Sequence, residues 1–184
     1  MLNKEQQQGL LKIARETIEK YVTERKIPEF TVDDPELLKS YGAFVTLRKG
    51  DSLRGCIGNI ISNQPLYELI RDMAIASSTQ DPRFFPVSPE ELKDIKIEIS
   101  VLSKPKLIKD VNEIELGRHG VIVKRGLNQG IFLPQVATET GWSKEGFLSN
   151  LCSQKAGLPP DAWKDKATEI YIFTAQVFEE EQYG

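Results

Sequence analysis

The chain has 184 residues, of which 40% are hydrophobic and 28% are charged. This length suits one sizeable hydrophobic core, or two lobes that share one, and the composition excludes a disordered chain. The formal charge of −3, from 24 basic and 27 acidic residues, provides no general positive field. That balance argues against nucleic-acid binding as the function.

The N-terminal residues are polar and lack the basic and then apolar layout of a signal peptide. No apolar run approaches the roughly 20 residues needed to cross a bilayer. The two cysteines, Cys56 and Cys152, are far apart in the sequence and too few for a disulfide scaffold. We therefore expect a cytoplasmic protein with reduced thiols and no membrane association.

The first predicted element is an amphipathic helix that ends before Pro28, because proline cannot donate to a helix and restricts the residue before it. Its apolar face carries Leu11, Ala14, Ile18, Tyr21 and Val22. Residues 28–40 form a connector.

Two strands and a second helix follow. The residues from Ala43 to Leu47 are typical of a strand, and after a turn the chain returns as a second strand from Leu53 to Ile61. Gly55 and Gly58 interrupt that second strand, which indicates a bulge or a close approach by another group. Pro65 suits the first turn of the next helix, whose inner face carries Leu66, Leu69, Ile70, Met73 and Ser77.

The strongest strand signal lies at residues 95–102, where isoleucine and valine alternate with polar residues. A hairpin is predicted over residues 121–133, with its turn around Gly126 and Asn128. A helix that buries Phe147, Leu148, Leu151 and Cys152 ends at Gly157, and a last strand runs from Glu169 to Phe178.

These strands and helices mix without regular alternation, which favours an α+β fold with mixed or antiparallel sheets and flanking helices. With no repeat, linker or low-complexity tract, residues 1–184 are predicted to be a single domain with a smaller lobe at about residues 105–150.

Several familiar functional motifs are absent from the sequence. It contains no Walker loop, no G-x-G-x-x-G, no G-x-S-x-G, no CxxC pair and no HExxH. One histidine and two scattered cysteines argue against a structural zinc site, so no metal site is predicted and the cofactor stays unknown.

The segment from Arg54 to Gly58 is the main candidate for chemistry. Its glycines remove side-chain cover, so the backbone amides there could approach a ligand closely. Cys56 could act as a nucleophile or redox thiol, and Arg54 would share its strand face if no bulge intervenes. The alternative is that Cys56 is a small buried residue and that Gly55 and Gly58 only allow strands to cross.

His119 is the only histidine, so any Cys–His pair must use it as the base. It is predicted in a turn just before the hairpin. A surface histidine without a function is the alternative.

Other candidates for substrate binding lie outside this segment. Asp81 and Arg83 flank Pro82 in a rigid turn that is predicted to expose both charges, where Arg83 could hold a carboxylate or phosphate. Glu98 and Ser100 share the polar face of their strand, and they either line a binding site or face water. We expect Cys56, Arg54, Arg83 and Glu98 to line one concave surface.

Seven segments in this order resemble the AMMECR domain family, and together they span nearly the whole chain. They are Gly42–Leu47, Leu53–Gly58, Asp81–Phe84, Glu98–Leu102, His119–Gly120, Leu133–Val136 (which contains Gln135) and Lys155–Gly157.

The resemblance implies an α+β fold with two unequal lobes around a cleft, toward which the Arg54-Gly55-Cys56 segment is directed. It also implies a role beside Memo-like and radical S-adenosylmethionine proteins in a modification pathway of unestablished purpose. It raises the weight of the functional interpretation of Arg54, Gly55 and Cys56, but it names no reaction or substrate.

Two main hypotheses therefore stay open, beside a weaker third, a role in nucleic-acid modification. In the first, the protein is an enzyme or an enzyme component, with Cys56 as the reactive thiol and His119 as the base; the substrate, a small anionic ligand, is bound by Arg54, Gly55, Gly58, Asp81, Arg83, Glu98, Ser100 and Gln135. In the second, the same residues form a binding module that presents a ligand or peptide to a partner without transforming it.

Overall fold

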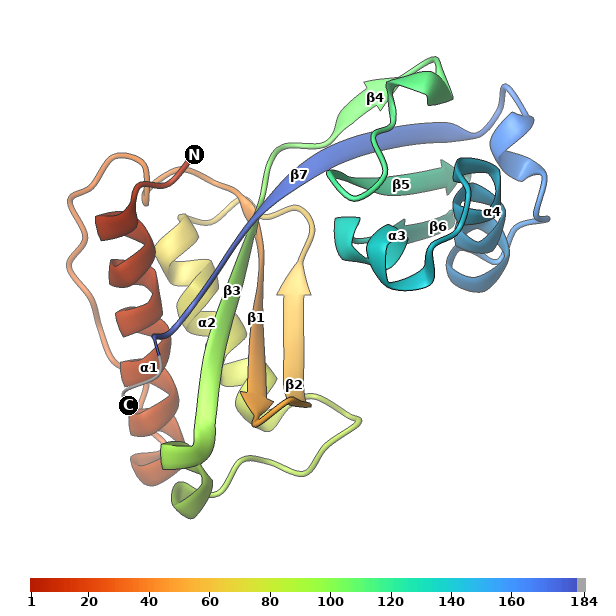
Figure 1. Ribbon diagram of the computed structural model, residues 1–184. Coiled ribbons are helices and arrows are strands. Elements are labelled where there is room, and N and C mark those ends of the chain that lie inside the picture. Colours follow the sequence, from red (N-terminus) through yellow and green to blue (C-terminus); the bar gives the residue numbers. More distant parts are fainter. Residues whose placement is uncertain (182–184) are drawn as a thin grey trace. The chain divides into compact units, whose positions relative to one another are not determined.

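The computed structural model describes residues 1–181 and divides into two compact units. The first unit comprises Met1–Leu102 and the residues from Gln176 onward, and the second comprises Ser103–Ala175. The strand pairings described within residues 1–181 are antiparallel, and helices flank the strands in each unit (Figure 1). The predicted α+β class with antiparallel sheets and flanking helices is confirmed.

The first unit is built on three neighbouring strands in the order β2-β1-β3, so β2 forms an edge. These are β1 (Gly42–Lys49), β2 (Ser52–Asn59) and β3 (Ile95–Leu102). The end of β7 (Glu169–Glu179) follows β3 in the strand order. All four strands were predicted, with bounds that differ by at most two residues.

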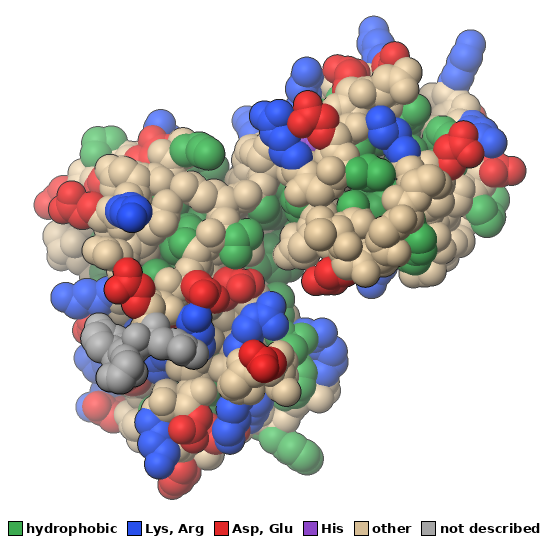
Figure 2. All heavy atoms as spheres, viewed as in Figure 1, with side chains coloured by type: hydrophobic (Ala, Val, Ile, Leu, Met, Phe, Trp, Pro, Cys, Tyr) green, Lys and Arg blue, Asp and Glu red, His purple; other side chains and the backbone are tan. Residues whose placement is uncertain are grey.

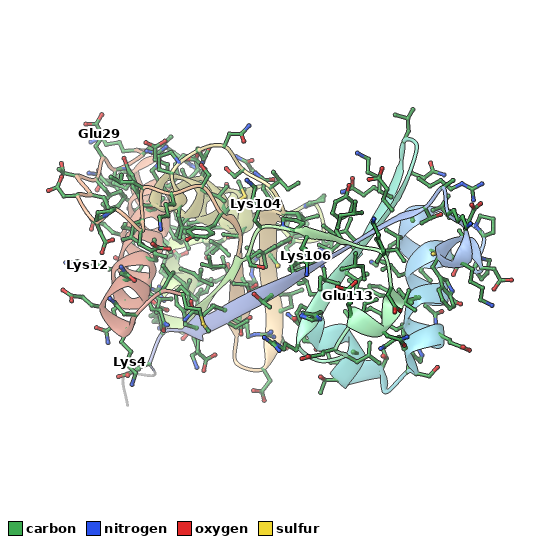
Figure 3. The ribbon with its side chains drawn as sticks, turned by 90° about the horizontal axis from the view of Figure 1, so that it is seen from above. Lys4, Lys12, Glu29, Lys104, Lys106 and Glu113 are labelled. Carbon is green, nitrogen blue, oxygen red and sulfur yellow. The ribbon has the colours of Figure 1, made fainter. Side chains whose placement is uncertain are left out.

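Two helices cover one face of these strands (Figure 1). They are α1 (Lys4–Glu24) and α2 (Leu66–Thr79). The core between helices and strands takes alternate strand residues, among them Val45, Ile97 and Ile99, which are fully buried. Exposed charged side chains such as Lys12 extend from the outer surface of α1 (Figure 3).

Local sequence signals explain how these elements begin and end. Asn3 and Gln6 form a capping box at the start of α1, and Arg25 ends the helix in the left-handed conformation, before Pro28 as predicted. Pro65 lies just before α2, where its missing amide costs no helical hydrogen bond. A short 3₁₀-helix, η1 (Pro89–Asp94), precedes β3.

The second unit surrounds its own core with short elements. Its strands are β4 (Lys106–Ile108), β5 (His119–Arg125), β6 (Asn128–Phe132) and the first part of β7, and β7 pairs with both β4 and β5. Its helices are α3 (Pro134–Thr140) and α4 (Lys144–Asn150), with 3₁₀ turns η2 (Val111–Glu113) and η4 (Ala162–Lys164). Lys106 and Glu113, labelled in Figure 3, form an ion pair of 3.7 Å within this unit.

The predicted helix that ends at Gly157 has two parts rather than one. After α4 the chain continues as a π-helical segment, η3 (Leu151–Ala156), and Gly157 closes it with a φ of +66°. Phe147, Leu148 and Cys152 are fully buried, as their spacing predicted. The change to π geometry lengthens the span of each backbone hydrogen bond by one residue, which the apolar pattern alone does not reveal.

Candidate functional site

Cys56 lies on the face of the first unit's strands that is opposite to the two helices. The odd-numbered residues of β1 face the core, while Thr46 pairs with Cys56 on one side and with Glu98 on the other. Residues directly opposite each other in antiparallel strands project to the same face. The side chains of Cys56, Thr46 and Glu98 therefore form a row across β2, β1 and β3.

The sulfur of Cys56 has a polar partner within this row. The Thr46 hydroxyl lies 3.2 Å from Sγ, where it can donate a hydrogen bond. Thr46 is only 6% exposed, whereas Cys56 is half-buried. The thiol thus has a buried hydroxyl as its partner, and the residue keeps part of its surface accessible.

The segment after α2 binds the backbone of Cys56 from the outer side of the edge strand. A carboxylate oxygen of Asp81 accepts a hydrogen bond from the Cys56 amide at 2.9 Å, and Arg83 Nη2 lies 3.4 Å from the Cys56 carbonyl oxygen. Arg83 also donates twice to Asp81, at 3.0 and 2.8 Å. These two side chains occupy the hydrogen-bonding positions that a neighbouring strand would otherwise fill.

The charge state of Asp81 follows from these contacts. Its side chain is only 2% exposed, and burial alone would favour the neutral acid. The hydrogen bonds from Arg83, together with the one from the Cys56 amide, outweigh burial and hold the pKa of this carboxyl well below its usual range. The prediction that both charges of this turn are exposed is therefore wrong for Asp81, while Arg83 is 55% exposed.

Arg54 occupies a β-bulge and points to a different partner. Leu47 pairs with Gly55 and Arg48 pairs with Leu53, so Arg54 is the extra residue of β2. Its guanidinium donates twice to Glu91, at 3.0 Å each, which lowers the pKa of Glu91 to about 2. The bulge removes the expected two-residue alternation between Arg54 and Cys56.

An aromatic ring lies between the two arginines of this region. The Phe84 ring centroid is 5.9 Å from the Arg54 guanidinium carbon and 5.4 Å from that of Arg83. Such contacts with a ring face are attractive for cations. Phe84 therefore links the Arg54–Glu91 pair to the Asp81–Arg83 pair.

The two glycines of β2 are explained by packing within the protein. A Cβ atom on Gly55 would lie 2.1 Å from the Ser77 carbonyl oxygen of α2, and one on Gly58 would lie 2.4 Å from the Phe44 ring. The prediction of a bulge and of close approach is confirmed, with the protein's own atoms as the close neighbours.

Glu98 and Ser100 share the outward face of β3, as the alternation predicted. Glu98 lies 3.7 Å from Arg48 and its side chain is 18% exposed. Ser100 is only 4% exposed, so it does not face water.

His119 and Gln135 belong to the second unit. His119 is the first residue of β5, and its Nδ1 accepts a hydrogen bond of 3.0 Å from the Glu115 amide. In neutral imidazole this contact leaves the proton on Nε2, which is then a donor. Gln135 is an exposed residue in the first turn of α3.

Cys152 provides the contrast to Cys56. It is fully buried in the core of the second unit, and burial raises the pKa of its thiol. No cluster of three or more His, Cys, Asp and Glu side chains able to hold a metal ion occurs within residues 1–181. In the same part of the chain, no helix is both long and apolar enough for a membrane span.

Two residues of this region, Thr46 and Glu91, were not predicted from the sequence to take part in it. Thr46 could have been placed beside it, because Phe44, Thr46 and Arg48 alternate with the apolar residues of β1. Glu91 forms a capping box with Ser88, a pattern visible in the sequence. Its pairing with Arg54 carries no sequence signal, since 37 residues separate the two.

Comparison with known proteins identifies the family. The model of a family described as AMMECR1 matches residues 11–178. Protein TK0174 of Thermococcus kodakarensis is 43% identical over 183 residues, covering 94% of this chain and 89% of that protein. Protein MK0488 of Methanopyrus kandleri is 46% identical over 190 residues, covering 98% of this chain and 91% of that protein.

A solved structure shares the fold as well. The crystal structure of the uncharacterized protein PH0010 from Pyrococcus horikoshii superposes with a TM-score of 0.85 at 44% identity, covering 94% of this chain and 90% of that one. The chain belongs to the AMMECR1 family.

Proposed function

We propose that this protein is an enzyme, or a component of one, in which the Cys56 thiol reacts with a small substrate. The observation that carries the proposal is the environment of this thiol. It is half-buried, its sulfur faces the Thr46 hydroxyl at 3.2 Å, and its backbone is bound on both polar atoms by Asp81 and Arg83. A residue that served only to fill the core would need none of these contacts.

Reactivity at a cysteine requires an accessible sulfur and a fixed orientation. Cys56 meets both requirements, whereas Cys152 has no access to solvent. The charges near the first unit's strands are of both signs, and Figure 2 shows acidic and basic side chains interspersed over the face drawn there. This mixed surface is consistent with a small ligand rather than a nucleic acid.

The proton acceptor has two candidates. Glu98 lies on the same face as Cys56, two strands away, or about 10 Å at the usual strand spacing. His119 is the second candidate, and it must give up its contact with the Glu115 amide before Nδ1 can accept a proton. Unlike His119, Glu98 therefore needs no rearrangement to accept the proton. A bridging water or substrate group must still span the gap between Cys56 and Glu98.

Trapping a covalent adduct tests this function. The native protein is incubated with the small-molecule fraction of a cell extract, and intact mass and peptide mapping follow. We expect an adduct on Cys56 and none on Cys152, which serves as the internal control. A Cys56→Ala variant should form no adduct. If neither thiol gains mass while a brief iodoacetamide treatment labels both equally, the proposal of thiol chemistry fails.

A non-catalytic binding module is the second candidate, and an exposed aromatic residue favours it. Phe85 is 90% exposed directly after the arginine and aromatic pair Arg83-Phe84. Exposed aromatic side chains are enriched where proteins bind partners. In this case a ligand should copurify without a covalent bond, Cys56→Ala should retain it, and Phe85→Ala should lose it.

From the family resemblance we also propose that the protein acts in the cytoplasm, in a modification pathway with Memo-like and radical S-adenosylmethionine proteins. A tagged protein expressed in its own host should then copurify with both. Recovery of neither would remove this part of the proposal and leave the proposed chemistry at Cys56 unaffected.

A further inference from the structure

The outer edge of β2 presents backbone groups that pair with no other strand within residues 1–181. Cys56 directs its amide and carbonyl to this edge, because both meet side chains there rather than β1. An edge strand is normally protected by charges, bulges or covering segments. Here a carboxylate and a guanidinium protect it at one residue, and that residue is the half-buried cysteine.

The side chains of Asp81 and Arg83 are held by contacts within their own turn. Pro82 separates Asp81 from Arg83 and restricts the backbone between them. Asp81 also accepts a hydrogen bond from the Arg83 amide at 3.1 Å, which closes the turn on itself. The Phe84 ring lies 5.4 Å from the guanidinium carbon and supports its orientation. These contacts hold the Asp81 carboxylate and the Arg83 guanidinium against each other.

We infer that Asp81 and Arg83 are positioning residues that hold the Cys56 backbone and set the reactivity of its thiol through their opposite charges. This inference rests on the proposed thiol chemistry at Cys56. Both side chains reach the cysteine through its backbone, so neither needs to touch the substrate. Their role differs from the substrate binding predicted for them from the sequence.

The opposite charges of Asp81 and Arg83 would act on the thiol in opposite directions. A carboxylate near a thiol opposes formation of the thiolate, and a guanidinium favours it. Two further ion pairs involve residues of the first unit's strands, Arg48 with Glu98 and Arg54 with Glu91, and Lys49 also contacts Glu91 at 3.4 Å. Removing one member of the Asp81–Arg83 pair should therefore unbalance the charge at the thiol.

The test is the pH profile of Cys56 alkylation by iodoacetamide, followed by peptide mass spectrometry in the full-length protein. In Asp81→Asn the amide oxygen can still accept from the Cys56 amide, but Arg83 loses its counter-charge. The pH of half-maximal rate should fall by roughly half a unit or more. In Arg83→Gln the Asp81 carboxylate is left without its partner, and the same midpoint should rise by a similar amount.

Two further variants serve as controls. Arg83→Lys keeps the positive charge and should restore a midpoint close to that of the unmodified protein. Asp72→Asn removes another carboxylate that pairs with an adjacent arginine, Arg71, at 2.9 Å, and it should leave the profile unchanged. Opposite shifts in Asp81→Asn and Arg83→Gln support the inference. Equal midpoints, or shifts in the same direction, overturn it.

Hydrogen exchange at the Cys56 amide provides a second readout. It should be roughly tenfold faster in Asp81→Ala than in the unmodified protein, and unchanged in Asp72→Asn. If Asp81 variants fail to fold, Arg83→Gln decides the question alone, because this side chain is 55% exposed and its replacement leaves the core intact. The adduct experiment on unmodified protein is separate. Opposite shifts would uphold the positioning role even if no adduct formed and iodoacetamide labelled both thiols equally, the result that rejects the proposed function.

Discussion

The two cysteines of this protein have opposite surroundings, and a serine substitution separates them. Serine is close to cysteine in size but introduces a hydroxyl that must be hydrogen-bonded when buried. At position 56 the Thr46 hydroxyl, 3.2 Å from the sulfur, can donate to the new oxygen. At position 152 the side chain is fully buried in an apolar core.

We therefore expect Cys56→Ser to change the free energy of unfolding by less than about 1 kcal/mol. Cys152→Ser should cost about 1–3 kcal/mol, because a hydroxyl enters the core. Urea denaturation of both variants measures the difference. If Cys56→Ser lost as much stability as Cys152→Ser, Cys56 would be identified as a core residue, and the case for its chemistry would be weaker.

The Arg54–Glu91 pair predicts a pH dependence of stability. The pKa of Glu91 is lowered to about 2 in the folded protein, from an ordinary value of 4.5. A carboxyl with a depressed folded pKa contributes stability above its unfolded pKa, and that contribution is lost as the pH falls through the folded value. The contribution of this pair is thus complete at neutral pH and declines between about pH 4.5 and 2.

Arg54→Gln should accordingly destabilise the protein by about 1 kcal/mol at pH 7, a modest value because the pair is partly solvated. The difference from the unmodified protein should shrink when urea unfolding is repeated near pH 3. Lys49→Gln is the matched control, since Lys49 reaches Glu91 at 3.4 Å with a side chain 46% exposed. A difference that stayed constant with pH would show that Arg54 acts through packing.

At the scale of elements, periodicity predicted most strands and helices because each buries one face. The alternation at residues 95–102 and the helical spacing at Phe147, Leu148 and Cys152 both led to buried faces. The bulge at Arg54 could not be located, since it depends on the pairing of β2 with β1 rather than on local composition. The burial of Asp81 likewise depends on a partner 25 residues away.

The glycines of β2 provide a test at this scale. Gly55→Ala would place a Cβ 2.1 Å from the Ser77 carbonyl oxygen, so α2 and β2 must separate. We expect the free energy of unfolding to fall by about 1–3 kcal/mol, as for other cases of overpacking. Gly9→Ala is the control, because Gly9 lies within α1 with no atom within 4 Å of its added Cβ.

In an open helical position alanine is favoured over glycine, so Gly9→Ala should stabilise the protein by about 0.5–1 kcal/mol. Thermal denaturation of both variants should therefore give midpoint changes of opposite sign. A neutral effect of Gly55→Ala would mean that the approach of α2 to β2 is looser than 2.1 Å implies.

At the scale of the whole molecule, one strand contributes residues to both compact units. β7 passes from the second unit to the first between Ala175 and Gln176. The first unit is therefore discontinuous in sequence, and its N-terminal residues 1–102 depend on a C-terminal segment. The sequence predicted this strand but not its division between two units, because that division arises from contacts far apart along the chain.

Several contacts join this C-terminal segment to the rest of the first unit. Phe178 is 8% exposed within the core that α1 and α2 form with the strands. Glu180 binds Arg15 of α1 at 2.6 Å and accepts a hydrogen bond of 2.9 Å from the Ile97 amide of β3. The segment thus ties a helix and a strand of the first unit together.

Phe178→Ala should therefore destabilise the first unit by about 3–5 kcal/mol, the usual cost of removing a buried phenylalanine. The neighbouring Val177 is 49% exposed, and Val177→Ala should change stability by less than about 1 kcal/mol. Hydrogen exchange measured by mass spectrometry resolves the effect by region. Exchange should accelerate in β1 and β3, which are far from Phe178 in the sequence. Equal effects of the two substitutions would show that residues 1–102 hold their fold without this strand.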